Sequence, residues 1–79
     1  MRIYTLNTSR EYEGIDDVMV FSTIANAHEE LLKIKAEAIK DGYIFADMAS
    51  ICQVELDTNK LQVLYSEDLR EWFDLQEVV

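Results

Sequence analysis

The sequence contains no proline, only two glycines and a single cysteine in 79 residues. Linkers and disordered tails are usually rich in proline and glycine, so their scarcity, with 49% hydrophobic residues, predicts a compact globular chain. Cys52 alone excludes an intramolecular disulfide framework, and we expect the reducing environment of the cytoplasm. No charged leader followed by an apolar segment is present, and no apolar run has membrane-spanning length. We expect one domain over residues 1–79.

Basic residues are also scarce. Seven Lys and Arg stand against sixteen Asp and Glu, which gives a net charge of −9. Most of this imbalance lies in residues 41–79, which hold nine acids and two bases, whereas residues 1–40 hold seven acids and five bases. Nucleic-acid affinity depends on Lys and Arg displacing counterions from phosphates, so direct binding to nucleic acid is not expected. The charge favours a basic protein partner.

Residues 23–42 are predicted to form the one long helix of the chain. Apolar residues recur on one stripe at helical spacing, and charged residues gather on the opposite side. Thr23, or alternatively Asn26 with Glu29 three residues later, is a suitable N-cap, and Gly42 can take the left-handed conformation that ends a helix. The stripe that should face a core consists of Ile24, Ala27, Leu31, Ile34 and Ala38, flanked by Leu32 and Ile39.

Strands are predicted on both sides of this helix from segments rich in β-branched and aromatic residues. The segment Val18–Phe21 is apolar throughout, which indicates either that both its faces are covered or that one face meets a partner. In residues 51–56 the alternation places Cys52 on the buried side with Val54 and Leu56. The predicted strands are residues 2–9, 18–21, 51–56 and 61–65, with a turn at 57–60 between the last two.

A short second helix is predicted at the C-terminal end. Ser66 is its expected cap, and Glu67 and Asp68 are expected in its first turn, where the helix dipole favours acids. The order of elements predicts the α+β class: a small antiparallel sheet of about four strands, with one long helix packed on one face and a short C-terminal helix.

Two apolar groups allow two interpretations each. Residues 43–50 are too apolar for a solvated loop, and their large side chains either join the core or form a dimer surface. The aromatic group of the C-terminal helix either seals the open end of the core or anchors a partner. The first group contains Tyr43, Ile44, Phe45 and Met48, and the second contains Leu69, Trp72 and Phe73.

Few residues could carry catalysis. A nucleophile pair of His28 and Cys52 requires that they meet across the contact between helix and sheet. A lone buried cysteine more often behaves as a small hydrophobic side chain. The segment 57–61 departs from a calcium-loop pattern, and no glycine-rich phosphate loop is present. We therefore expect no enzyme activity, no cofactor and no metal.

Two acidic clusters are the candidate partner-binding surfaces. Along a helix, the like-charged pairs Glu67–Glu71 and Glu71–Asp74 repel each other. Repulsion that no contribution to the fold compensates indicates a binding role for these acids. The alternative is a solvated surface that keeps the protein soluble. The C-terminal cluster contains Glu67, Asp68, Glu71, Asp74 and Glu77, and the cluster near the N-terminus contains Glu11, Glu13, Asp16 and Asp17.

Several short motifs together resemble a known family. They are the opening Met1-Arg2-Ile3-Tyr4 with Leu6, the segment 11–14 (EYEG), the helix entry 21–23 (FST) and the segment 54–57 (VELD). Over most of residues 1–65 the chain resembles a family of short uncharacterised phage and bacterial proteins with the order strand-strand-helix-strand-strand. By analogy with small acidic phage proteins, the resemblance implies an inhibitor of bacterial defence, such as an anti-CRISPR protein, acting in the host cytoplasm.

These observations lead to two hypotheses for the function. The first is a non-enzymatic acidic inhibitor, or DNA mimic, that occupies the basic nucleic-acid-binding surface of a host defence protein of the CRISPR-Cas type. The alternative is a structural or regulatory homodimer, built on residues 43–48 or on an open sheet edge, in which the charge only maintains solubility.

Overall fold

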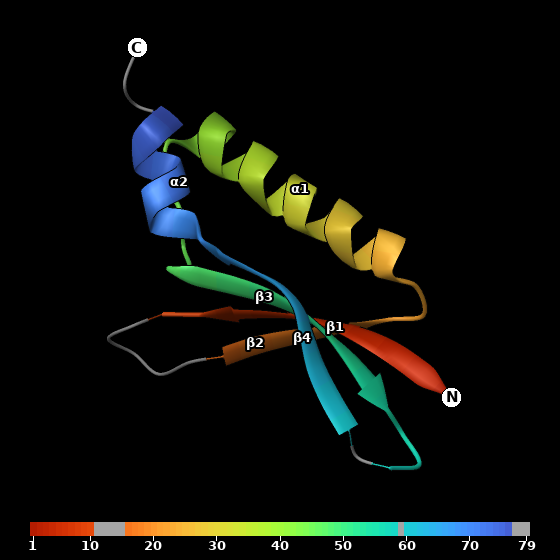
Figure 1. The fold of residues 1–79 in the computed structure, drawn as a ribbon. Coiled ribbons are helices and arrows are strands. Elements are labelled where there is room, and N and C mark those ends of the chain that lie inside the picture. The colour runs from red at the N-terminus through yellow and green to blue at the C-terminus, as the bar shows by residue number, and fades with distance from the viewer. Residues whose placement is uncertain (11–15, 59, 77–79) are drawn as a thin grey trace.

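The computed structural model describes residues 1–10, 16–58 and 60–76, which form one antiparallel sheet and two helices (Figure 1). The sheet has the strand order β2-β1-β3-β4, and both helices lie on the same side of it. This arrangement confirms the predicted α+β class. The elements are β1 (Arg2–Ser9), β2 (Asp16–Phe21), α1 (Ile24–Asp41), β3 (Met48–Glu55), β4 (Lys60–Asp68) and α2 (Leu69–Gln76).

The central strands are β1 and β3, and the register of the sheet fixes which side chains face the helices. Leu6 of β1 lies opposite Met19 of β2 and opposite Ile51 of β3, so these three side chains share the helix-covered side. Between β3 and β4 the register shifts at one point: Ile51 is paired with Tyr65, but the next residue, Cys52, is paired with Val63. The shift is a β-bulge that leaves the intervening Leu64 without a directly opposed partner on β3.

Helix α1 begins and ends where the sequence predicted. The hydroxyl of Thr23 accepts a hydrogen bond from the backbone N–H of Asn26 at 3.2 Å, so Thr23, and not Asn26, is the N-cap. Gly42 ends the helix with φ of 70°, a conformation that side chains with a Cβ rarely adopt. The predicted stripe faces the sheet, with Ala27, Leu31, Ile34 and Ala38 buried and Ile24 at the exposed margin.

The core is a single thin layer between the sheet and the two helices. Side chains of Leu6 and Ile51 from the sheet meet the stripe of α1, and Leu69 and Phe73 of α2 complete the cluster at one end. Among the residues that the structure describes, Leu6, Ile51 and Leu69 are the large side chains that are fully buried. Of the aromatic group in α2, Leu69 and Phe73 therefore belong to the core, and Trp72 packs against it half-buried.

The junction of β4 and α2 corrects one prediction. Strand β4 continues through Asp68, because Ser66 pairs with Ser50 and Asp68 pairs with Met48 of β3. The carboxylate of Asp68 accepts a hydrogen bond from the backbone N–H of Glu71 at 2.9 Å. Asp68, not Ser66, therefore caps α2, and the placement of Glu67 and Asp68 in the first helical turn was wrong.

The segment between α1 and β3 is fastened to the end of β1. The backbone N–H of Asp47 donates to the carbonyl of Ser9 at 2.9 Å, and the guanidinium of Arg10 donates to the carbonyl of Phe45. Ile44 is consequently buried in the core, and Phe45 packs against it. Of the two interpretations of this group, the core applies to Ile44 and Phe45, whereas Tyr43 and Met48 remain exposed, so the four residues do not form one surface.

Candidate protein-binding surfaces

The catalytic pair considered from the sequence is not formed. Cys52 pairs with Thr5 across the strands, and its Sγ accepts a hydrogen bond from Nδ2 of Asn7 at 3.4 Å, on the side of the sheet away from the helices. His28 belongs to α1, and its ring lies 5.6 Å from that of Tyr65 on the helix-covered side. Cys52 is buried, as predicted, at 3% exposure, but the strand alternation set by Leu6 and Ile51 points it to the side of the sheet away from the helices, so the condition for a pair with His28 is not met.

The described part of the chain offers no site for a metal ion: no three or more His, Cys, Asp or Glu side chains are grouped to hold one. Among the same residues, no helix combines the length and the apolar character needed to cross a membrane.

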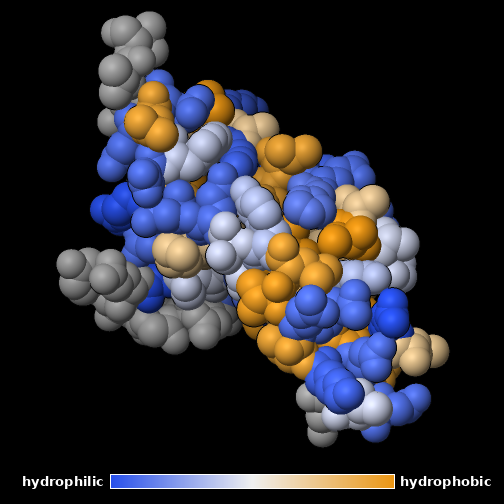
Figure 2. Space-filling model, viewed as in Figure 1, coloured by the Kyte–Doolittle hydropathy of each residue, from blue (hydrophilic) through white to orange (hydrophobic). Residues whose placement is uncertain are grey.

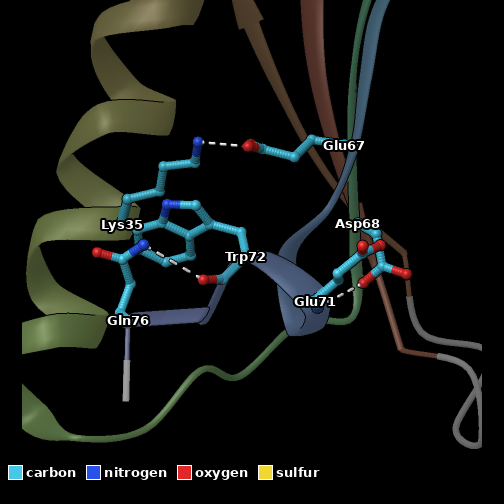
Figure 3. A network of polar contacts seen from close by, with 6 residues as sticks. All are labelled: Lys35, Glu67, Asp68, Glu71, Trp72 and Gln76. Atoms are coloured by element: carbon cyan, nitrogen blue, oxygen red, sulfur yellow. Dashed lines mark hydrogen bonds and ion pairs between the residues drawn. The ribbon is translucent and has the colours of Figure 1, made fainter. Parts of the chain in front are cut away.

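Glu67 takes part in a contact that joins α1, β4 and α2 (Figure 3). Its Oε1 lies 2.6 Å from Nζ of Lys35, and both side chains are only 17% exposed. The same ammonium lies 4.9 Å from the centre of the Trp72 ring, a distance at which a cation is attracted to the aromatic face. The second carboxylate oxygen, Oε2, is buried and has no hydrogen-bond partner in the described structure. Glu67 thus points into the molecule and holds α1 against β4, unlike its neighbours in the C-terminal acidic cluster.

Asp68, Glu71 and Asp74 form an exposed group that we call the α2 acidic surface. Figure 3 shows Asp68 and Glu71 on the side of α2 away from α1. These three acids, with the exposed Leu75, line a shallow hollow. Arg70 borders it, and its Nε lies 2.8 Å from the carboxylate of Asp47. Three of the five predicted C-terminal acids are therefore brought together at the surface.

The other predicted acids are placed elsewhere or not at all. Asp16 and Asp17 begin β2, an edge strand that β1 and β3 separate from β4, and Asp17 is exposed. The structure does not bring Asp17 and the α2 acidic surface together on neighbouring strands. Glu11, Glu13 and Glu77 lie outside the described residues.

A second surface, which the sequence indicated only in part, is the side of the sheet that no described element covers. Val18 and Val20 of β2 are 56% and 61% exposed, and Leu61 and Val63 of β4 are 62% and 56% exposed. Figure 2 shows apolar side chains gathered along the β4 edge of the sheet. We define the open sheet face by its apolar and small residues across the four strands: Val18, Val20, Ile3, Thr5, Cys52, Val54, Leu61 and Val63. Thr5 and Cys52, in the central strands, are only 8% and 3% exposed, so the exposed apolar surface lies mainly on the two edge strands.

The signal for this face lay in the continuous apolar run of β2. Met19 and Phe21 pack against the core, and the alternation turns Val18 and Val20 to the other side. Of the two interpretations of this run, coverage of both faces within the chain does not occur in the described structure. The contribution of β4 was hidden, because its bulge at Leu64 breaks the period of two that sequence patterns rely on.

Comparisons with known proteins add no assignment to these surfaces. No family model, no curated protein and no solved structure matches the chain. The resemblance to short phage and bacterial proteins therefore stays a prediction from motifs.

Proposed function

We propose that this protein is a non-enzymatic binding protein whose α2 acidic surface engages a basic surface of a nucleic-acid-handling protein. The observation that carries the proposal is the isolation of the acids. In the described structure, the side chains of Glu71 and Asp74 are exposed and form no ion pair or hydrogen bond with another residue. Like charges three residues apart on a helix destabilise it slightly, so their retention is better explained by a partner than by the fold.

The spacing of the carboxylates suits a surface that normally binds a phosphate backbone. Asp68, Glu71 and Asp74 follow one another at intervals of three residues, which corresponds to about 4.5 Å along a helix axis. Phosphates of one DNA strand follow at about 3.4 Å along the duplex axis, a comparable density of negative charge. The net charge of −9 adds a long-range attraction that speeds the encounter with a basic partner.

The rigidity of α2 supports the same proposal. The helix has only eight residues, but Leu69 and Phe73 anchor it in the core, and Asp68 caps its first turn. The backbone N–H of Leu69 also donates to the carbonyl of Asp47 at 2.8 Å. A short helix held in this way presents its acids in a fixed geometry, which reduces the entropy lost on binding. In its specific form, the proposal assigns the partner to bacterial defence proteins of the CRISPR-Cas type, whose nucleic-acid groove the protein would block.

The test reverses charge at two positions that the fold does not use. Glu71→Lys with Asp74→Lys changes the α2 acidic surface, and Glu29→Lys with Glu37→Lys makes the same change in net charge on exposed positions of α1. Glu67 and Asp68 are left intact, because they hold the structure together. Each protein is titrated against a panel of DNA-binding bacterial defence proteins, CRISPR effectors included, with displacement of labelled duplex DNA as the measurement.

We expect the α2 variant to lose displacement activity by at least about tenfold and the α1 variant to keep most of it, because close charge pairs contribute more than distant ones. Equal losses of displacement activity in both variants would show that net charge alone, and not the position of the acids on α2, determines binding. Wild-type protein that displaces DNA from no member of the panel would contradict the proposal.

A further inference from the structure

We propose that a second copy of this chain covers the open sheet face, so that the protein is a homodimer in which two four-stranded sheets pack face to face. This inference does not depend on the proposed partner of α2, because the open sheet face lies on the opposite side of the sheet from both helices (Figure 1). The two surfaces meet only at Asp68, whereas Glu71 and Asp74 belong to α2 alone.

No described element covers the side of the sheet that faces away from the helices. Sheets of soluble domains normally bury at least one apolar face, and a face that is solvated alternates to polar residues. Here Val20, Val63 and Leu61 stand on the face that the helices do not cover, each more than half exposed. The molecule is correspondingly flat, with extents of 46 × 26 × 16 Å. A second sheet at the usual separation of about 10 Å would supply the missing layer.

The distribution of charge indicates the occupant of the open sheet face. Strand alternation places Arg2, Asp17, Glu55 and Lys60 on the same side as the helices, and Arg2 and Glu55 form an ion pair there at 3.0 Å. Among the side chains that the structure describes, which do not include that of Asp16, the open sheet face carries no charge apart from Asp68 at its end. The carboxylate of Asp68 is hydrogen-bonded to the first turn of α2.

A nearly uncharged face in a chain of net charge −9 does not fit a basic protein, which would need carboxylates opposite its cations. It does not fit a nucleic acid either, because phosphates would need cations opposite them. It fits a second neutral, valine-rich face. In a face-to-face dimer the charged sides of both copies point outward, which keeps the two sets of acids apart while the apolar faces are in contact.

The side of the sheet away from the helices is large enough for an interface. Four strands at about 4.8 Å, with about eight residues each at about 3.3 Å, give roughly 500 Å² for that whole side, of which the open sheet face is the apolar part. Two whole sides together approach the roughly 1,000 Å² that a specific interface requires, so the contact must also include neighbouring polar residues such as Asn7 and Ser50. The residues are suitable as well, because Val, Ile and Thr are stiff side chains that lose little rotational freedom on burial. A two-fold axis through the face makes every contact occur twice.

The experiment measures mass in solution for wild type and four variants. Val20→Thr with Val63→Thr keeps β-branched residues in both strands, so the strands are retained, but each hydroxyl enters the contact without a partner. Val20→Lys is the stronger change. Leu32→Gln is the matched control, since Leu32 is an exposed apolar residue on α1, and Tyr43→Ser tests the other exposed apolar group. Sedimentation velocity and light scattering are run over about a hundredfold range of concentration, with circular dichroism to confirm folding.

We expect wild type, Leu32→Gln and Tyr43→Ser to be dimers whose melting temperature rises with protein concentration. The Val20→Thr/Val63→Thr variant should raise the dimer dissociation constant by about tenfold or more, because four unpaired hydroxyls enter the interface. Val20→Lys should be monomeric. If Val20→Lys does not fold, the Thr variant and the concentration dependence of wild type still decide the question.

Three results would overturn the inference. The first two are a wild type that is monomeric at every concentration and a dimer that both valine variants leave unchanged. The third is dissociation by Tyr43→Ser alone, which would assign the interface to the segment after α1. The charge-reversed variant Glu71→Lys/Asp74→Lys should remain dimeric, so failure of the dimer and failure of the α2 acidic surface are distinguishable.

Discussion

The ion pair of Lys35 with Glu67 should contribute far more to stability than its surface counterpart. Replacement of Lys35 by Met keeps an unbranched side chain of similar length against Trp72 but removes the cation. The carboxylate of Glu67 then stays in a site where both side chains are only 17% exposed, with neither oxygen paired. Breaking a buried pair destabilises by about 3–5 kcal/mol, and residual solvent access at this site places the expectation near the lower value, about 3 kcal/mol.

The double variant Lys35→Met/Glu67→Leu should recover most of that loss, because apolar replacement of both partners removes the unpaired charge. From these changes we expect a coupling energy of about 2 kcal/mol between Lys35 and Glu67. The pair of Arg2 with Glu55 is the control: its 3.0 Å contact joins side chains that are 61% and 36% exposed, and exposed pairs contribute about 0.2–1 kcal/mol.

Both double-mutant cycles can be measured by urea unfolding at one fixed protein concentration, with circular dichroism and the fluorescence of Trp72 as probes. Trp72 is the only tryptophan and lies under the ammonium of Lys35, so its emission also reports whether the contact persists in each variant. A coupling for Lys35 with Glu67 no larger than that for Arg2 with Glu55 would refute the reasoning. Glu67 would then be as available to a partner as the acids of the α2 acidic surface.

Three further changes test the local structure, each by denaturant unfolding. Leu31→Ala should destabilise by about 2–5 kcal/mol because it empties a core site, whereas Leu32→Ala, on the exposed side of α1, should change stability by less than about 0.5 kcal/mol. Gly42→Ala should cost about 1–2 kcal/mol through its φ of 70° alone, since a Cβ there meets no atom within 4 Å; an unchanged stability would contradict this. Asp68→Ala removes the cap of α2 and should cost about 0.5–2 kcal/mol, whereas Ser66→Ala should have little effect.

The sequence predicted those parts of the fold that local chemistry determines. The stripe of α1 follows from a repeat of 3.6 residues, and both of its ends follow from single residues, Thr23 and Gly42, whose capping roles need no distant partner. The antiparallel sheet followed from β-branched segments joined by short connections. These features depend on interactions within a few residues, which a pattern can show.

The errors arose where distant pairing overrides local preference. Ser66 and the acids after it have the pattern of a helix start, but hydrogen bonding to β3 extends β4 by three residues and moves the cap to Asp68. Tertiary contacts of this kind leave no local signal. The burial of Cys52 was predicted, but the side on which it is buried was not, because a strand pattern tells which residues share a face and not which of the two faces the helices will cover.

The candidate surfaces were predictable to different degrees. Charge is a property of composition, so the acids of α2 were identified, but the burial of Glu67 depends on Lys35, which lies 32 residues away. The open sheet face emerges only when Val20, Thr5, Cys52 and Val63 are aligned by the register of four strands. Each strand contributes two residues to the open sheet face. Two residues are too few to distinguish a binding face from ordinary surface variation.

Salt should act on the two proposed surfaces in opposite directions. Attraction between the α2 acidic surface and a basic partner is screened as the Debye length falls from about 10 Å at 0.1 M to about 3 Å at 1 M, so that binding should weaken steeply. Two copies of the chain, each with a net charge of −9, repel one another, and screening relieves this repulsion without weakening apolar contacts. The homodimer should therefore be as stable or more stable at high salt. A salt titration of one sample, with dimer mass and partner binding as separate measurements, tests both expectations. A dimer that dissociates with rising salt must be held by charges. The open sheet face, which carries no described charge except at its end, could then not be its interface.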